Sequence, residues 1–198
     1  MFALFLALLL GGCSGGAELQ PLGPDDVVLA FGDSLTWGTG AGREASYPAV
    51  LQALIGRRVI NAGVPGEETD GGLARLPELL EAHRPALVII SHGGNDMLRR
   101  RDPAQTEANL RAMVSLAHES GAGVVLVAVP EPRITMSSPD FYAGVAADYD
   151  LVLEDSAWRY ILRRNQLKSD PIHPNAEGYR HFAEVMAELL EAAGAVGY

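Results

Sequence analysis

The amino-acid sequence predicts an α/β protein with a five-stranded parallel sheet and helices on both faces. Short apolar runs rich in β-branched residues alternate five times with longer segments whose apolar residues recur at helical spacing. The connections between them are short, and a strand, a helix and a second strand joined in this way form a parallel unit. A chain of 198 residues suffices for one such domain with a sizeable core.

The strands are predicted from their apolar runs. The run Leu87–Ser91 is apolar almost throughout, which is typical of a central strand buried on both faces. The run that begins at Val27 stops at Gly32, where the chain can turn sharply. The five predicted strands are 27–32, 58–62, 87–91, 124–129 and 151–153.

The helices are predicted from spacing and from end signals. Pro48 begins a helix that runs to about Ile55, with Val50, Leu51, Leu54 and Ile55 facing inward. Thr69 or Asp70 is expected to cap the next helix, and Asp102 the one after it. Further helices are predicted over about 140–149, over 156–164, and from about Asn175 onward.

The composition restricts the classes of function. The formal net charge is −10, and no basic stripe of the kind that nucleic-acid binding requires is present. The glycine-rich segment 36–42 lacks the Gly-Lys-Ser/Thr ending of a phosphate-binding loop, so no nucleotide cofactor is expected. There is no cysteine pair and no two-histidine spacing, so no metal site is expected either.

The first residues resemble a bacterial lipoprotein signal. Met1–Leu10 is almost wholly apolar, is too short to span a bilayer, and is followed by Gly11-Gly12-Cys13. The resemblance implies cleavage before Cys13 and lipid attachment to its thiol, although no Lys or Arg precedes the apolar run. The expected organisation is a signal peptide over 1–12, a tether over 13–24 and the domain over 25–198, anchored in the cell envelope, facing the periplasm or in the outer membrane.

Four short segments carry polar side chains that could act together. Three of them follow predicted strands: Gly32-Asp33-Ser34, Asn61-Ala62-Gly63 and Gly93-Gly94-Asn95-Asp96. The fourth, Asp170-Pro171-Ile172-His173, precedes the last helix. Ligands of open α/β sheets bind outside the carboxyl ends of the strands, so these segments are expected to converge at one edge.

Acyl transfer needs the groups that these segments supply. Ser34 is the candidate nucleophile, His173 the base that takes its proton, and Asp170 the carboxylate that orients the imidazole. A tetrahedral intermediate also needs donors placed for its oxyanion. We expect them to be the backbone N–H groups of Ser34 and Gly63 and the side-chain amide of Asn95.

These segments resemble the four sequence blocks of the SGNH, or GDSL-type, hydrolase superfamily. Ser34, Gly63, Asn95 and His173 stand in order at the four namesake positions, and Asp170 matches the acidic residue of the Asp-x-x-His block. The resemblance covers about Val27 to Ala193 and is closest to small bacterial arylesterases, thioesterases and lysophospholipases. It implies a three-layer α/β/α sandwich with a flavodoxin-like sheet, a serine esterase that uses no cofactor, and a small ester, thioester or lysophospholipid as substrate.

Several alternatives stay open at this point. The activity could instead be that of an O-acetylesterase on envelope polysaccharide, or the chain could be an inactive binding lipoprotein of the same fold. Trp37 could line a substrate groove or cover the core. The run Arg99-Arg100-Arg101 is interpreted as a solvated loop, with contact to anionic head groups as the alternative. We expect a monomer.

Overall fold

In a computed structural model, which describes residues 17–132 and 135–197, five parallel strands form one sheet in the order β2-β1-β3-β4-β5. The strands are β1 (Val27–Gly32), β2 (Arg58–Gly63), β3 (Leu87–Ser91), β4 (Gly123–Val127) and β5 (Val152–Glu154). This is the flavodoxin-like order, and it confirms the predicted three-layer fold. β4 ends two residues before the predicted Val129.

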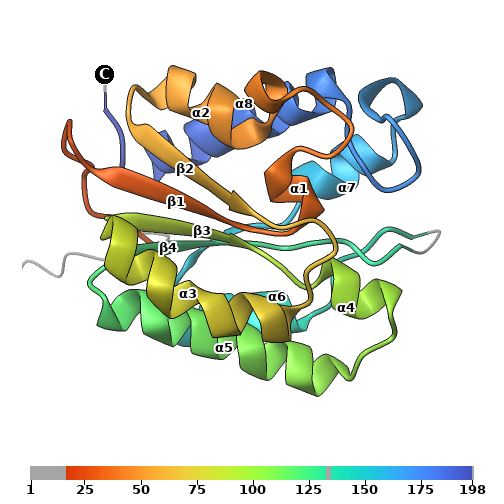
Figure 1. Cartoon of the computed structure of the whole chain (residues 1–198), viewed down its shortest axis with the longest axis horizontal. Helices are drawn as coiled ribbons and strands as arrows, with labels where there is room; N and C mark the ends of the chain where they lie inside the picture. The colour runs from red at the N-terminus through yellow and green to blue at the C-terminus, as the bar shows by residue number, and fades with distance from the viewer. Residues whose placement is uncertain (1–16, 133–134, 198) are drawn as a thin grey trace, which may run out of the picture.

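Helices cover both faces of the sheet. The helices α2 (Tyr47–Ile55), α7 (Ala157–Leu162) and α8 (Ala176–Ala192) lie on one face, and α3 (Thr69–His83), α5 (Pro103–Glu119) and α6 (Phe141–Tyr149) lie on the other (Figure 1). Two short helices, α1 (Ser34–Trp37) and α4 (Gly94–Leu98), directly follow β1 and β3. The sequence did not predict these two, because each is barely longer than one turn and has no apolar periodicity.

The buried side chains lie in the sheet and on the helix faces that contact it. All five residues of β3 are buried, as expected for a central strand covered on both faces. Between the sheet and α8, the Trp158 and Phe182 rings stack with centroids 3.6 Å apart. The prediction that Leu54 faces inward is wrong. Its side chain is 42 % exposed, because it lies on the solvent side of α2 while Leu51 and Ile55 are buried.

The N-terminus of α3 is capped from another element. Thr69 is the first residue of the helix, and neither its side chain nor that of Asp70 caps it, contrary to the expectation. Instead, Oδ2 of the buried Asp96 accepts a hydrogen bond from the Thr69 N–H at 3.0 Å, and Oδ1 accepts from the Thr69 hydroxyl at 2.6 Å. Asp96 therefore fixes α4 to the start of α3.

Residues 17–24 do not form a free tether, so the predicted boundary at residue 24 is wrong for the part that the structure describes. The Leu19 N–H donates to Ala193 O at 2.9 Å, and the Leu22 N–H donates to Ala195 O at 2.7 Å. Leu22 is 7 % exposed and belongs to the core. The predicted signal peptide and Cys13 lie outside the described residues. Among those described, no helix is both long and apolar enough to cross a membrane.

Candidate active site

Ser34 stands where β1 gives way to α1. Asp33 caps this short helix, and its Oδ1 accepts a hydrogen bond from the Leu35 N–H at 3.0 Å. A Cβ on Gly32 would collide with the Thr36 side chain and the Ser91 carbonyl oxygen, so only glycine fits between the strand end and this helix. The break from strand to helix therefore exposes the Ser34 hydroxyl at the carboxyl edge of the sheet.

The structure brings Ser34, His173 and Asp170 together, as the sequence predicts. His173 Nε2 lies 3.1 Å from Ser34 Oγ, and His173 Nδ1 lies 2.7 Å from Asp170 Oδ2. Asp170 Oδ1 accepts hydrogen bonds from the backbone N–H groups of Ile172 and His173. One carboxylate thus orients both the loop and the imidazole.

The carboxyl group of Asp170 is partly exposed. Its limited burial would raise the pKa, but hydrogen bonds from His173 and from two backbone N–H groups outweigh this effect and lower the pKa below its usual value. Asp170 is therefore ionised in the range where histidine titrates. A nucleophile, a base and an oriented carboxylate are the arrangement of a serine hydrolase triad.

Asn95 also reaches the site. It lies in the first turn of α4, is 8 % exposed, and donates from Nδ2 to Asp33 Oδ2 at 3.0 Å. Asp33 is itself buried, and this burial raises its pKa, although His92, the Leu35 N–H and Asn95 partly offset the effect. Because the amide has two hydrogens, one remains for an oxyanion while the other holds Asp33.

The predicted role of Gly63 as an oxyanion donor is wrong. The Gly63 N–H donates to Asn61 Oδ1 at 3.0 Å, and Gly63 does not line the cavity at Ser34. A Cβ at this position would overlap the backbone of Trp37 in α1. Gly63 is therefore a glycine because β2 passes close to α1, and its N–H is already used.

Gly66, and not Gly63, lies beside the cavity at Ser34. Val64-Pro65-Gly66-Glu67 forms a type II turn, in which Gly66 has φ +78° and the Glu67 N–H donates to Val64 O at 3.2 Å. Gly66 lines the cavity together with Ser34 and Asn95, and no acceptor among the described residues takes its N–H. The Pro-Gly pair directly after a strand is the signal that could have identified it.

The cavity beside Ser34 has a volume of about 230 Å³ and is mostly apolar. Its buried lining includes Leu35, Val129 and Leu162, whereas Leu98 and Ile172 are exposed at its rim. Trp37 does not line it. This side chain is 41 % exposed, and the Arg43 guanidinium lies 5.0 Å from the centre of its ring.

Two residues of the arginine run contact the Gly66 turn or the residue that follows it. Arg99 Nη1 donates to Gly66 O at 3.1 Å, and both Arg99 and Arg101 pair with Glu68. The hydrogen bond from Arg101 outweighs slight desolvation and lowers the Glu68 pKa. These residues are thus not simply solvated, and they connect the loop after α4 to the turn after β2.

No group of three or more His, Cys, Asp or Glu side chains in the described part of the chain is placed to hold a metal ion.

Comparisons with known proteins agree with this geometry. The model of the GDSL-like lipase/acylhydrolase family matches residues 30–181. Esterase TesA of Pseudomonas aeruginosa is 35 % identical over 179 residues, which cover 85 % of this chain and 89 % of that protein. Thioesterase 1/protease 1/lysophospholipase L1 of Escherichia coli K12 is 32 % identical over 174 residues, or 84 % of each chain.

A solved structure shares the fold over nearly its whole length. The crystal structure of TesA superposes with a TM-score of 0.77 and 31 % identity, and the match covers 85 % of this chain and 99 % of that one. The family model spans more than half of the chain, and it includes the segments of Ser34, Gly66, Asn95 and His173. The chain is therefore a carboxylic ester hydrolase and belongs to the GDSL-like lipase/acylhydrolase family, also called the SGNH hydrolases.

Proposed function

We propose that this enzyme hydrolyses carboxylic esters and thioesters through an acyl-enzyme on Ser34. The observation that carries the proposal is the continuous chain of hydrogen-bond distances from Ser34 Oγ through His173 to Asp170, at the mouth of an apolar cavity. A serine hydroxyl is a weak nucleophile until an adjacent base takes its proton. His173 is within reach to do so.

The reaction proceeds in two acyl transfers. Ser34 Oγ attacks the carbonyl carbon while its proton passes to His173 Nε2, and the carbonyl oxygen becomes an oxyanion. The N–H groups of Ser34 and Gly66 and the Asn95 amide stabilise that charge. The leaving alcohol or thiol takes the proton from His173. A water molecule, activated by the same imidazole, then cleaves the acyl-enzyme and restores Ser34.

The cavity favours an apolar acyl or aryl group on the substrate. Leu35, Val129 and Leu162 offer no hydrogen-bonding side chain to a bound sugar, which argues against acetylated polysaccharide as the substrate. Relatives named as esterase, thioesterase and lysophospholipase agree with an acyl chain bound in such a cavity. Small aryl esters, acyl thioesters and lysophospholipids are the proposed substrate classes.

The leader sequence supports a second proposal, that the mature protein is anchored to the cell envelope by a lipid on Cys13. The Cys13→Ser variant should then leave the membrane fraction while its specific activity in solution stays unchanged. Sedimentation of this variant with membranes after a high-salt wash would contradict the anchor.

Comparing wild type with Ser34→Ala on a panel of substrates tests the enzymatic proposal. The panel holds p-nitrophenyl esters of increasing chain length, an acyl-CoA, a lysophospholipid and an acetylated sugar. Ser34→Ala should lose turnover and should not be labelled by a fluorophosphonate. Turnover of the acetylated sugar alone would support the O-acetylesterase, and absence of any labelling of the wild type would support the binding lipoprotein.

A further inference from the structure

A cluster of three polar side chains lies beneath the Gly66 turn and takes no direct part in the proposed reaction. Glu67, the residue after Gly66, receives hydrogen bonds from Arg75 Nε at 2.7 Å and Arg75 Nη2 at 2.6 Å. His92 Nε2 lies 3.1 Å from Glu67 Oε2, and because a carboxylate only accepts, the imidazole donates. The His92 side chain is fully buried, and that of Glu67 is 10 % exposed.

The Arg75 guanidinium also binds the ends of two strands. Its Nη2 donates to Ala62 O at 2.8 Å, near the end of β2, and to Gly32 O at 3.3 Å, the last residue of β1. Ser34 follows Gly32 by two residues, and the Gly66 turn follows β2. A single side chain of α3 therefore connects the strand that carries the nucleophile, the strand that leads to the turn, and the turn itself.

The surrounding residues are fitted to this cluster. A Cβ on Gly72 would lie 2.7 Å from His92 Nε2, so a glycine in α3 leaves the space that the imidazole fills. The Arg75 guanidinium lies 4.3 Å from the centre of the Phe31 ring, and the His92 ring lies 5.1 Å from it. Arg75 and His92 thus both pack against Phe31, a buried residue of β1.

The cluster contains a charged pair with little access to water. Burial would raise the pKa of Glu67, but the hydrogen bonds from His92 and Arg75 and the positive charge of Arg75 outweigh burial and lower it. Glu67 is therefore ionised at neutral pH. Partly buried ion pairs are often no more stabilising than apolar side chains of similar size, so this pair is better explained by the groups that it positions than by stability.

From these contacts we infer that Glu67, Arg75 and His92 are positioning residues, which hold the Gly66 N–H at the place where it meets the oxyanion. The inference rests on the proposed function. A type II turn built on Pro65 and Gly66 has only the one internal hydrogen bond from Glu67 to Val64. Without the contacts to Glu67, the turn would be held by that bond, by the bond from the Val64 N–H to Gly32 O and by the exposed contact from Arg99.

The next residue in the chain offers a matched control. Glu68 has the same side chain as Glu67 and also pairs with arginines, but its partners Arg99 and Arg101 are 45 % and 58 % exposed. Exposed pairs of this kind contribute little, so removing one should disturb the turn less. Glu67→Gln and Arg75→Lys test the buried cluster, and Glu68→Gln tests the exposed one.

The experiment measures kcat and KM on a p-nitrophenyl ester, the rate of inactivation by a fluorophosphonate, and thermal unfolding of each variant. Misplacement of a catalytic group by about 1 Å costs about 100-fold in rate, so we expect Glu67→Gln and Arg75→Lys to lower kcat by about 10- to 100-fold with KM nearly unchanged. Phosphonate inactivation should slow in parallel, because its adduct also presents an oxygen to the Gly66 N–H. Glu68→Gln should stay within about twofold of wild type on both measurements.

Three results would overturn the inference: a folded Arg75→Lys or Glu67→Gln variant with wild-type kcat, a loss confined to KM, or an equal loss in Glu68→Gln. A purely structural role predicts the first of these, with a lowered melting temperature and normal rates in the folded fraction. Phosphonate labelling reports on the site without an ester substrate. If the inference is wrong but the proposed function is right, all variants should be labelled at the same rate. If the proposed function is wrong, the wild type itself should not be labelled.

Discussion

Asn95 donates its side-chain amide to Oδ2 of Asp33 at 3.0 Å, although the two residues come from the ends of different strands. Asp33 immediately precedes the nucleophile and also caps the helix that begins at Ser34. The bond therefore fixes the Asn95 amide, the proposed oxyanion donor, relative to Ser34, the proposed nucleophile. A donor held in this way stabilises the transition state without having to reorganise during the reaction.

Replacing Asn95 by alanine should mainly slow the chemical step. Loss of one oxyanion donor costs about 10²- to 10³-fold in kcat, and KM should change little because the neutral carbonyl accepts a weaker hydrogen bond. Steady-state kinetics and a melting curve on one preparation measure both quantities. A variant with a lowered melting temperature and undiminished kcat would leave Asn95 with a structural role only.

The pKa of Asp33 predicts a pH-dependent difference in stability between the wild type and Asp33→Asn. Because burial raises the folded-state pKa above the unfolded value of about 3.9, the contribution of this carboxyl is fully present below about pH 4 and is lost as pH rises through the folded-state value. The melting temperature of the wild type minus that of the variant should therefore fall as the pH rises above about 4. A difference that rises with pH would contradict the direction of the shift.

The two glycines after β2 should respond differently to alanine. At Gly63 a Cβ overlaps the Trp37 backbone, and such overpacking costs about 1–3 kcal/mol or more. At Gly66 the nearest atom of the described residues, apart from its chain neighbours, is Arg99 Nη2 at 3.7 Å, so the penalty is that of a positive φ, about 1–2 kcal/mol. Urea unfolding should show Gly63→Ala as the less stable variant, while Gly66→Ala should fold and lose kcat. If Gly66→Ala were the less stable variant, the interpretation of Gly63 as the glycine required by close packing against α1 would be contradicted.

The N-terminal segment should contribute measurably to stability. Leu22→Ala removes a buried side chain and should lower the free energy of unfolding by about 2–4 kcal/mol. Leu54→Ala is the control, because Leu54 is 42 % exposed and its truncation should stay within about 0.5 kcal/mol. Denaturant titration measures both changes. Equal small changes would mean that residues 17–24 are only loosely attached.

The positions of the strands and the residues of the triad could be predicted because both depend on local patterns, whereas the order of the strands was implied by the resemblance to a known family. Apolar runs locate strands such as Leu87–Ser91, and the carboxyl ends of parallel strands meet at one edge. This brings Ser34 and Asn95 together. The spacing of Asp170 and His173 places both on one loop.

What could not be predicted depends on contacts between distant residues. Gly63 ends β2 as expected, yet the type II turn carries the chain back so that Gly66 reaches the cavity. Glu68 pairs with Arg101, 33 residues away, and no local pattern reveals this pair. The segment before β1 has the glycine and proline content of a linker, but Leu22 bonds to Ala195 at the other end of the chain.

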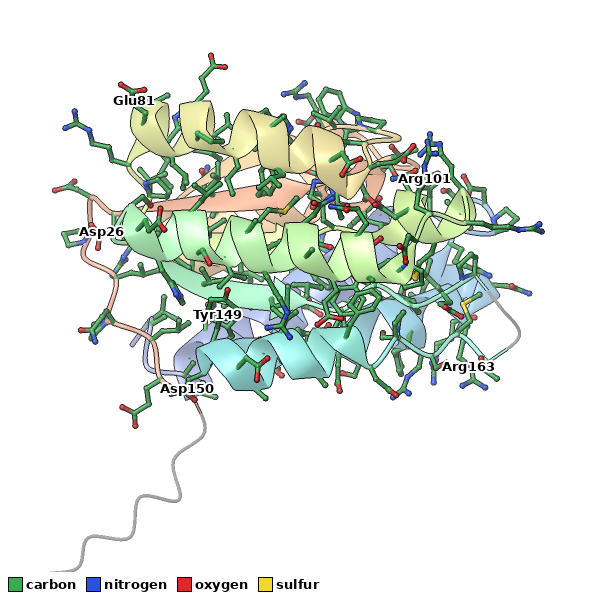
Figure 2. All side chains as sticks on the ribbon, turned by 90° about the horizontal axis from the view of Figure 1, so that it is seen from below. Asp26, Glu81, Arg101, Tyr149, Asp150 and Arg163 are labelled. Atoms are coloured by element: carbon green, nitrogen blue, oxygen red, sulfur yellow. The ribbon has the colours of Figure 1, made fainter. Side chains whose placement is uncertain are left out.

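If a lipid on Cys13 anchors the protein as proposed, the attachment of the N-terminal segment would determine which way the enzyme faces. Asp26, which precedes β1, and Arg101, which follows α4 beside the active site, lie at opposite ends of the molecule (Figure 2). With the proposed lipid on Cys13, only five residues separate Cys13 from Leu19, and this length of chain spans at most about 20 Å. The catalytic mouth would then be turned away from the anchoring leaflet. Its substrates would arrive from the aqueous side as dispersed molecules, and lipids embedded beside the anchor would stay out of reach.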